Sequence, residues 1–221
     1  MTVTAIINCE DLRDEGARCA KEGFFSLSLV DIPKSDKRYI ERIGTYIAAA
    51  SLYSELFSRP MPDLYFDEYG KPYFREKGIY ISLSHRPGVS VVCFSDTPSG
   101  VDVERDASTS KLDRVRERLL SRIKGVPGSL SVRYMTARLG ESGELFDLTD
   151  LPFNALSRLS VTSIHSLEEN PVLAFTALEA AAKCTGLGIS RFLGTGADIS
   201  GFFADSILYR DFTVTTFIKK G

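Results

Sequence analysis

Residues 79–106 read IYISLSHRPGVSVVCFSDTPSGVDVERD and contain the most distinctive pattern of the chain. Two apolar runs rich in β-branched residues, 79–84 and 89–95, are separated by a His-Arg-Pro-Gly turn. A Pro-Ser-Gly break then leads into Gly-Val-Asp-Val-Glu at 100–104. The pattern predicts three short strands in succession.

Two acidic side chains stand two residues apart on the third predicted strand. Alternate side chains of a strand point to the same face, so Asp102 and Glu104 project together while Val101 and Val103 pack behind them. Hard divalent cations prefer oxygen ligands, and this pair could form half of a metal site. A D-x-E pair is nevertheless more often a solvent-facing surface, and a lone histidine at a strand end, here His85, is more often structural.

The first half of the chain contains one well-defined helix. Apolar residues recur at three- and four-residue spacing from Tyr39 to Phe57, Ser35 can cap the start, and Pro60 stops the helix. Other elements are predicted by shorter patterns: a strand at 3–8, a polar helix at 10–22, a strand at 24–30, and short strands at 64–66 and 72–74 around a turn at Gly70.

The second half begins after a probable linker, Ala-Ser-Thr-Ser, at 107–110. Residues 112–123 form an amphipathic pattern with a basic opposite face, which is usually only a solvated surface. Residues 125–170 give no firm assignment. A helix is predicted from Pro171 to Gly186 with Asn170 as its N-cap, and residues 202–219 alternate like a closing hairpin.

This order of elements favours an α+β fold with antiparallel sheets. Strands occur in runs after single helices, and neither a Walker loop nor a Rossmann glycine loop is present. A helix followed by a hairpin occurs in both 35–105 and 170–220, which suggests a duplication, although no residue-level repeat supports it. We therefore expect two halves, an N-terminal one at 1–106 and a C-terminal one at 107–221.

Composition narrows the class of protein. The 221 residues are 43% hydrophobic and carry a formal net charge of -2, so no global basic field indicates nucleic-acid binding. The four cysteines are dispersed, with no C-x-x-C, which fits a reducing cytoplasm. Neither a signal peptide nor a membrane-spanning segment is recognisable. We expect a cytoplasmic monomer that binds neither nucleic acid nor membranes.

Four motifs occur in a fixed order along the chain. They are Gly-Lys-Pro at 70–72, Ser-His at 84–85, Gly-Val-Asp-Val-Glu at 100–104 and F-x-x-L-E-x-x-x-K-x-x-G at 175–186. In type, order and spacing they resemble the motifs of the Sfp-type 4′-phosphopantetheinyl transferases. The match is strong over 64–106, good over 171–190 and weak elsewhere. The resemblance implies two similar α+β halves, a pseudo-duplicated 4′-phosphopantetheinyl transferase fold, with the active site between them.

The resemblance also implies roles for individual residues. Asp102, Glu104 and Glu179 would be ligands of Mg²⁺. The residues that would bind coenzyme A are Lys71, Ser84, His85, Lys183 and an arginine of the long helix, with Arg38 a better candidate than Arg42. Lys183 would lie at the pyrophosphate and stabilise the leaving phosphate, and Glu179 or a metal-bound water would take the proton of the acceptor serine. Glu179, Lys183 and His85 would thus form the catalytic set.

Two positions depart from the family pattern. Phe175 replaces a tryptophan, which is acceptable if the ring only packs. Leu178 replaces the lysine that precedes the glutamate, which would remove a cation from the coenzyme A site.

The resemblance implies Mg²⁺-dependent transfer of the 4′-phosphopantetheine group from coenzyme A to a serine of an acyl or peptidyl carrier protein. Adenosine 3′,5′-bisphosphate would be released. Two alternatives stay open. One is a non-catalytic relative that binds coenzyme A or a carrier protein without transfer, as Leu178 suggests, and the other is a metal-dependent phosphohydrolase of coenzyme A. Carrier proteins of this kind are generally acidic, so we expect docking on the basic face of residues 111–124.

Overall fold

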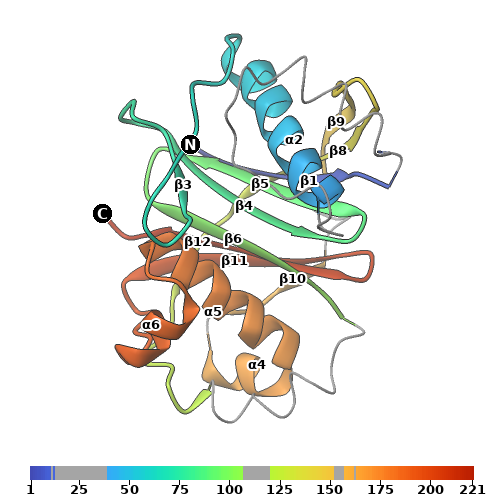
Figure 1. Ribbon diagram of the computed structural model, residues 1–221. Coiled ribbons are helices and arrows are strands. Elements are labelled where there is room, and N and C mark those ends of the chain that lie inside the picture. The colour runs from blue at the N-terminus through green and yellow to red at the C-terminus, as the bar shows by residue number, and fades with distance from the viewer. Residues whose placement is uncertain (11, 13–38, 107–119, 152–156, 162) are drawn as a thin grey trace.

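The computed structural model describes the chain apart from residues 11, 13–38, 107–119, 152–156 and 162. Two five-stranded sheets lie face to face at its centre, and one long helix covers the outer side of each (Figure 1). The architecture is therefore α+β, as the order of elements predicted.

The first sheet has the strand order β4-β5-β1-β8-β9. Its strands are β4 (Tyr80–Arg86), β5 (Val89–Ser95), β1 (Thr2–Asn8), β8 (Arg133–Leu139) and β9 (Leu145–Asp150). The pairing of β1 with β8 is parallel, and the other pairings are antiparallel. The turn between β4 and β5 is only Pro87-Gly88, so His85 and Arg86 belong to the strand and not to the turn.

The second sheet has the order β10-β11-β12-β6, with β7 added in parallel to β11. Its strands are β10 (Ser157–Leu159), β11 (Phe202–Tyr209), β12 (Phe212–Lys219), β6 (Ser99–Arg105) and β7 (Gly128–Ser129). The hairpin of β11 and β12 turns at Arg210-Asp211, as the alternating pattern predicted.

The remaining elements lie outside these sheets. They are α2 (Tyr39–Phe57), α4 (Ile164–Glu169), α5 (Pro171–Thr185), α6 (Ile189–Gly194) and the small ladder of β2 (Tyr65–Phe66) with β3 (Pro72–Tyr73). The predicted start and end of α5 are confirmed: Asn170 Oδ1 accepts a hydrogen bond from Leu173 N, and Gly186 ends the helix with φ 76°.

Three apolar clusters fill the spaces between these layers. One lies between α2 and the first sheet, one between the two sheets, and one between α5 and the second sheet. Strand alternation makes this possible, because Val3, Ala5 and Ile7 of β1 pack toward α2 while Ile6 packs toward the second sheet. Burial of three faces holds both sheets in one body.

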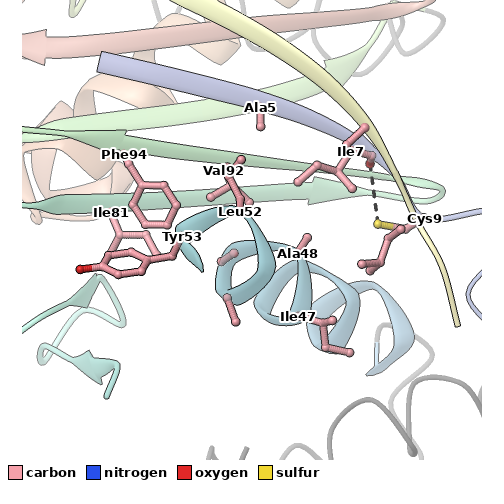
Figure 2. Close-up of a cluster of buried hydrophobic side chains, with 14 of the residues drawn as sticks. Ala5, Ile7, Cys9, Ile47, Ala48, Leu52, Tyr53, Ile81, Val92 and Phe94 are labelled. Carbon is pink, nitrogen blue, oxygen red and sulfur yellow. Dashed lines mark hydrogen bonds between the residues drawn. The ribbon is translucent and has the colours of Figure 1, made fainter. Parts of the chain in front are cut away.

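The cluster under α2 combines aliphatic and aromatic side chains (Figure 2). Tyr53 is fully buried and meets Phe94 edge-on, with ring centroids 5.5 Å apart. The Cys9 thiol donates to the Ile7 carbonyl, and burial raises its pKa to about 11. This thiol therefore belongs to the core.

The expected division of the chain at residue 106 does not coincide with the division between the two sheets. Strand β6 precedes that point and lies in the second sheet, whereas β8 and β9 follow it and lie in the first sheet. The predicted helix at 10–22, the strand at 24–30, the cap Ser35 and the basic face of 111–119 fall outside the described residues. Among the helices that the structure describes, none has the length and apolar character needed to cross a membrane.

Candidate functional site

The two sheets meet along their edge strands, β4 and β6. Alternate residues of β4 each contact β6 through a side chain: Ser82 Oγ accepts from Val101 N at 3.0 Å, Ser84 Oγ donates to Asp102 at 2.8 Å, and Arg86 pairs with Glu104. Side chains thus replace a backbone ladder between the two edges. This contact brings the period-two spacing of the two strands into register, so that Ser84 lies opposite Asp102 and Arg86 lies opposite Glu104.

Asp102 is the most deeply buried acid of the site, with only 2% of its surface exposed. Its Oδ1 accepts hydrogen bonds from Lys183 Nζ at 2.7 Å and Ser84 Oγ at 2.8 Å. Its Oδ2 is buried and has no hydrogen-bond partner among the described residues. A buried carboxylate oxygen in this state is costly unless another group engages it.

Helix α5 supplies the other acid and the ammonium. Glu179 and Lys183 are four residues apart and lie on one face, and Lys183 Nζ also donates to Ser84 Oγ and to the Val101 carbonyl. Burial, with the charge of Asp102 second, raises the pKa of Glu179, while Lys183 acts in the opposite direction. The Glu179 carboxyl therefore holds a proton more readily than an exposed glutamate.

The close seating of α5 on β6 depends on Gly100. A Cβ at this position would lie 2.0 Å from the Ala180 carbonyl oxygen and 2.4 Å from Cys184 N. Any side chain here would push the helix away, so the glycine lets Lys183 reach Asp102.

Glu104 is held by a bidentate arginine. Arg86 Nε donates to Glu104 Oε2 at 2.8 Å, and Arg86 Nη2 pairs with Oε1. The hydrogen bonds that Arg86 donates to Glu104 raise the pKa of Arg86, and the charges of Asp102 and Glu179 add to this effect. The guanidinium therefore lies within the field of all three acids that were expected to bind Mg²⁺.

Lys71 enters the site from the turn between β2 and β3. Asp67 Oδ1 accepts from Tyr69 N at 2.9 Å and from Lys71 N at 2.8 Å, and Gly70 takes a positive φ of 79°. Lys71 Nζ then donates to the Cys184 carbonyl at 2.8 Å. Burial lowers the pKa of this ammonium. The turn thus fixes a partly desolvated cation beside the C-terminus of α5.

Two pockets adjoin at this place and share Gly70, Pro72 and Leu83 as lining residues. The smaller has a volume of about 240 Å³ and contains Lys71, Glu179 and Lys183. The larger has a volume of about 470 Å³ and is lined by the following residues in addition: Arg42, Thr45, Tyr46, Phe66 and His85. A cleft lined by cationic side chains therefore extends from α5 to α2.

Ser84 and His85 face opposite sides of β4. The Ser84 hydroxyl is engaged by Asp102 and Lys183, whereas His85 lies in the larger pocket with Nε2 3.9 Å from Glu41 Oε2. Arg42 lines the same pocket as His85. Arg38, the arginine favoured for the nucleotide, falls outside the described residues.

Leu178 points away from the cleft. It is completely buried in the apolar cluster under α5, where Phe175 also packs at the margin. The Leu178 side chain is therefore a core residue in this chain, and its position offers no place for a cation at the pockets. Phe175 has the packing role that its replacement of tryptophan requires.

The expected Mg²⁺ would need oxygen atoms of Asp102, Glu104 and Glu179 that are free to coordinate it. In the part of the chain that the structure describes, no three His, Cys, Asp or Glu side chains are arranged as a ready metal site. The carboxylate chemistry and the unpartnered Oδ2 of Asp102 suit a hard cation, while both oxygens of Glu104 are engaged by Arg86. The residue types therefore suit Mg²⁺, while the arrangement of Arg86 and Glu104 in this structure does not leave Glu104 free to coordinate it.

Comparison of the chain with protein-family models and with curated proteins finds no match. What the site can do therefore follows from its own geometry and from the four motifs.

Arg86 is the residue of this site that the sequence interpretation missed. It was assigned to a turn, although residues 82, 84 and 86 continue the period-two alternation of β4 opposite the D-x-E of β6. Extending the strand by two residues would have predicted an arginine facing an acid. Gly100 gave a weaker signal, because a glycine before a strand also fits a simple break.

Proposed function

We propose that this protein transfers the 4′-phosphopantetheine group of coenzyme A to a serine of an acyl or peptidyl carrier protein. One observation carries the proposal: the buried Asp102 of β6 meets Lys183 of α5 beside Glu179, at a pocket that also contains Lys71. Carboxylates and ammonium groups converge there from elements distant in sequence. Phosphoryl transfer depends mainly on such positioning and on neutralisation of charge.

The proposal includes the fold of the 4′-phosphopantetheinyl transferases, with two similar halves around a shared site. It is supported by the arrangement of one long helix on each sheet, α2 on the first and α5 on the second. The cleft lies where the two sheets meet, at β4 and β6, which is where a site between halves would form.

The two pockets match the two charged parts of coenzyme A. The larger pocket offers Arg42 and His85 for a phosphate, and Tyr46 and Phe66, whose ring centroids are 6.0 Å apart, for a base. The smaller pocket offers Lys71 and Lys183 for the pyrophosphate. A nucleotide with a 3′-phosphate in the larger pocket would thus present its pyrophosphate beside Asp102 and Glu179.

The reaction joins the serine oxygen to the phosphorus that carries pantetheine and breaks the bond from that phosphorus to the oxygen of adenosine bisphosphate. Glu179 accepts the serine proton, and Lys183 stabilises the charge that develops on the leaving phosphate. Lys71 holds the pyrophosphate in place. Mg²⁺, held by Asp102, Glu104 and Glu179, would supply Lewis-acid neutralisation of the pyrophosphate.

A second candidate is a protein that binds coenzyme A or a carrier protein without transfer. It is favoured by the closed state of the acids, because Arg86 takes both oxygens of Glu104 and Lys183 takes one oxygen of Asp102. A permanently neutralised cluster would bind an anion but would leave no place for Mg²⁺.

The test is incubation with coenzyme A, Mg²⁺ and a panel of apo carrier proteins, followed by intact mass spectrometry. Transfer adds one phosphopantetheine group to the carrier protein and releases adenosine 3′,5′-bisphosphate. Glu179→Gln and Asp102→Asn should each lower the rate at least about a hundredfold, whereas Lys220→Gln, which lines neither pocket, should not. Binding of coenzyme A without a mass change would support the second candidate. Free phosphopantetheine without a modified carrier would indicate a hydrolase.

A further inference from the structure

Arg86 forms a two-bond ion pair with Glu104, an acid of the site that is largely buried. The side chain of Glu104 is only 12% exposed, and the guanidinium reaches it with two parallel hydrogen bonds. Such forks are stronger and more specific in geometry than a single contact. The pair therefore fixes Glu104 in one position.

The guanidinium brings Glu104 the positive charge that a bound cation would otherwise supply. It interacts electrostatically with Asp102 and Glu179 as well as with Glu104. In the described structure the buried Oδ2 of Asp102 nevertheless has no hydrogen-bond partner. Arg86 therefore offsets negative charge in the cluster but leaves this oxygen without a hydrogen bond. A buried oxygen in this state is costly, and a bound cation would satisfy it.

Arg86 also has room to leave. Its side chain is 36% exposed and lines a pocket of about 460 Å³ at the β4–β5 turn. That pocket is lined by two further acids, Glu10 and Glu41, and by Arg105, which pairs with Asp211. A guanidinium that swings away from Glu104 would therefore find carboxylates again.

We propose that Arg86 is a built-in counter-ion that closes the carboxylate cluster and must release Glu104 before a divalent cation binds. This inference rests on the proposed function, because the cation is the one which that reaction uses. The free protein then binds divalent cations weakly, and removal of the guanidinium strengthens their binding. The gain depends on Asp102, whose Oδ2 becomes a ligand.

The experiment measures Mn²⁺ affinity, by electron paramagnetic resonance of the free ion and by calorimetry, for the full-length protein and for Arg86→Gln. Arg86→Gln should bind Mn²⁺ at least about tenfold more tightly, which corresponds to about 1.4 kcal/mol. Adding Asp102→Asn to Arg86→Gln should remove this gain. The matched control is Arg133→Gln, because Arg133 of β8 forms the same two-bond fork with Asp150 of β9, and both of these side chains are exposed.

The outcomes separate this inference from the proposed function. Equal affinities of the wild type and Arg86→Gln, or a gain that survives Asp102→Asn, would overturn the role of Arg86 and leave the metal site standing. Absence of Mn²⁺ binding in every variant would overturn both. If Arg86→Gln does not fold, as judged by circular dichroism, Arg86→Lys takes its place. It keeps the charge but loses the fork, so it should bind Mn²⁺ several-fold more tightly than the wild type, and unchanged affinity would refute the inference.

Discussion

Gly100→Ala should disrupt the seating of α5 on β6. The new Cβ would lie 2.0 Å from the Ala180 carbonyl oxygen and 2.4 Å from Cys184 N, both in the backbone of α5, where side-chain rotation gives no relief. Because real Cβ contacts essentially never fall below 3.0 Å, the helix must move away by about 1 Å. Overpacking of this kind costs about 3 kcal/mol, at the upper end of the usual range, because a whole helix has to shift.

The expected loss corresponds to a melting temperature about 6–12 °C lower for a chain of this size. Thermal and urea unfolding, followed by circular dichroism, measure it directly. The same shift would separate Lys183 from Asp102, and a misplacement of about 1 Å can reduce a transfer rate about a hundredfold.

The control for this substitution is Gly201→Ala. No atom lies within 4 Å of a Cβ built at Gly201, so its melting temperature should stay within about 2 °C of the wild type. A Gly100→Ala variant that melts as high as Gly201→Ala would show that α5 does not rest on β6 at this distance.

Two further predictions concern α5. Glu179→Gln should raise the stability of the metal-free protein at neutral pH. The folded-state pKa of Glu179 is raised above 4.5, so its ionisation penalises the folded state above that raised pKa and not below 4.5. The difference in urea midpoint should shrink as the pH falls toward 4.5, and a constant difference would contradict a titration effect. Leu178→Lys should cost about 3–5 kcal/mol because it buries a charge in the core, whereas Leu178→Met should cost less than about 1.5 kcal/mol. Equal unfolding midpoints of these two variants would contradict the burial of this position.

The sequence predicted the elements whose signals are local. Helix α5 has a side-chain cap at Asn170, a proline at its first position and a glycine at its end, and each of these acts within a few residues. The closing hairpin alternates cleanly on both sides of its turn. Such patterns need no knowledge of the rest of the chain.

The sheet partners could not be predicted in the same way. Strand β6 pairs with β12 and not with the hairpin that precedes it, and β8 pairs with β1 across more than a hundred residues. These choices depend on which apolar faces meet once all strands exist, and no local signal encodes them. The sequence interpretation left residues 125–170 unassigned for the same reason.

The expectation for Leu178 shows how a motif can mislead about direction. The resemblance places a lysine at position 178, so the sequence predicts that Leu178 removes a cation from the coenzyme A site. On a helix, adjacent residues are about 100° apart, and the structure places Leu178 in the core while Glu179 faces the pocket. Only the orientation of α5 on the second sheet, fixed by Gly100, decides which of the two enters the site.

The charge balance of the cleft connects the arginine to the proposed reaction. When ionised, Asp102, Glu104 and Glu179 carry three negative charges, and Arg86, Lys183 and Lys71 carry three positive charges, so the closed site has no net charge. Exchange of Arg86 for a divalent cation would raise the charge of the site by one unit. The site would then attract a polyanion such as coenzyme A more strongly. An arginine that opposes cation binding would therefore also weaken the binding of coenzyme A to a site that lacks its cation.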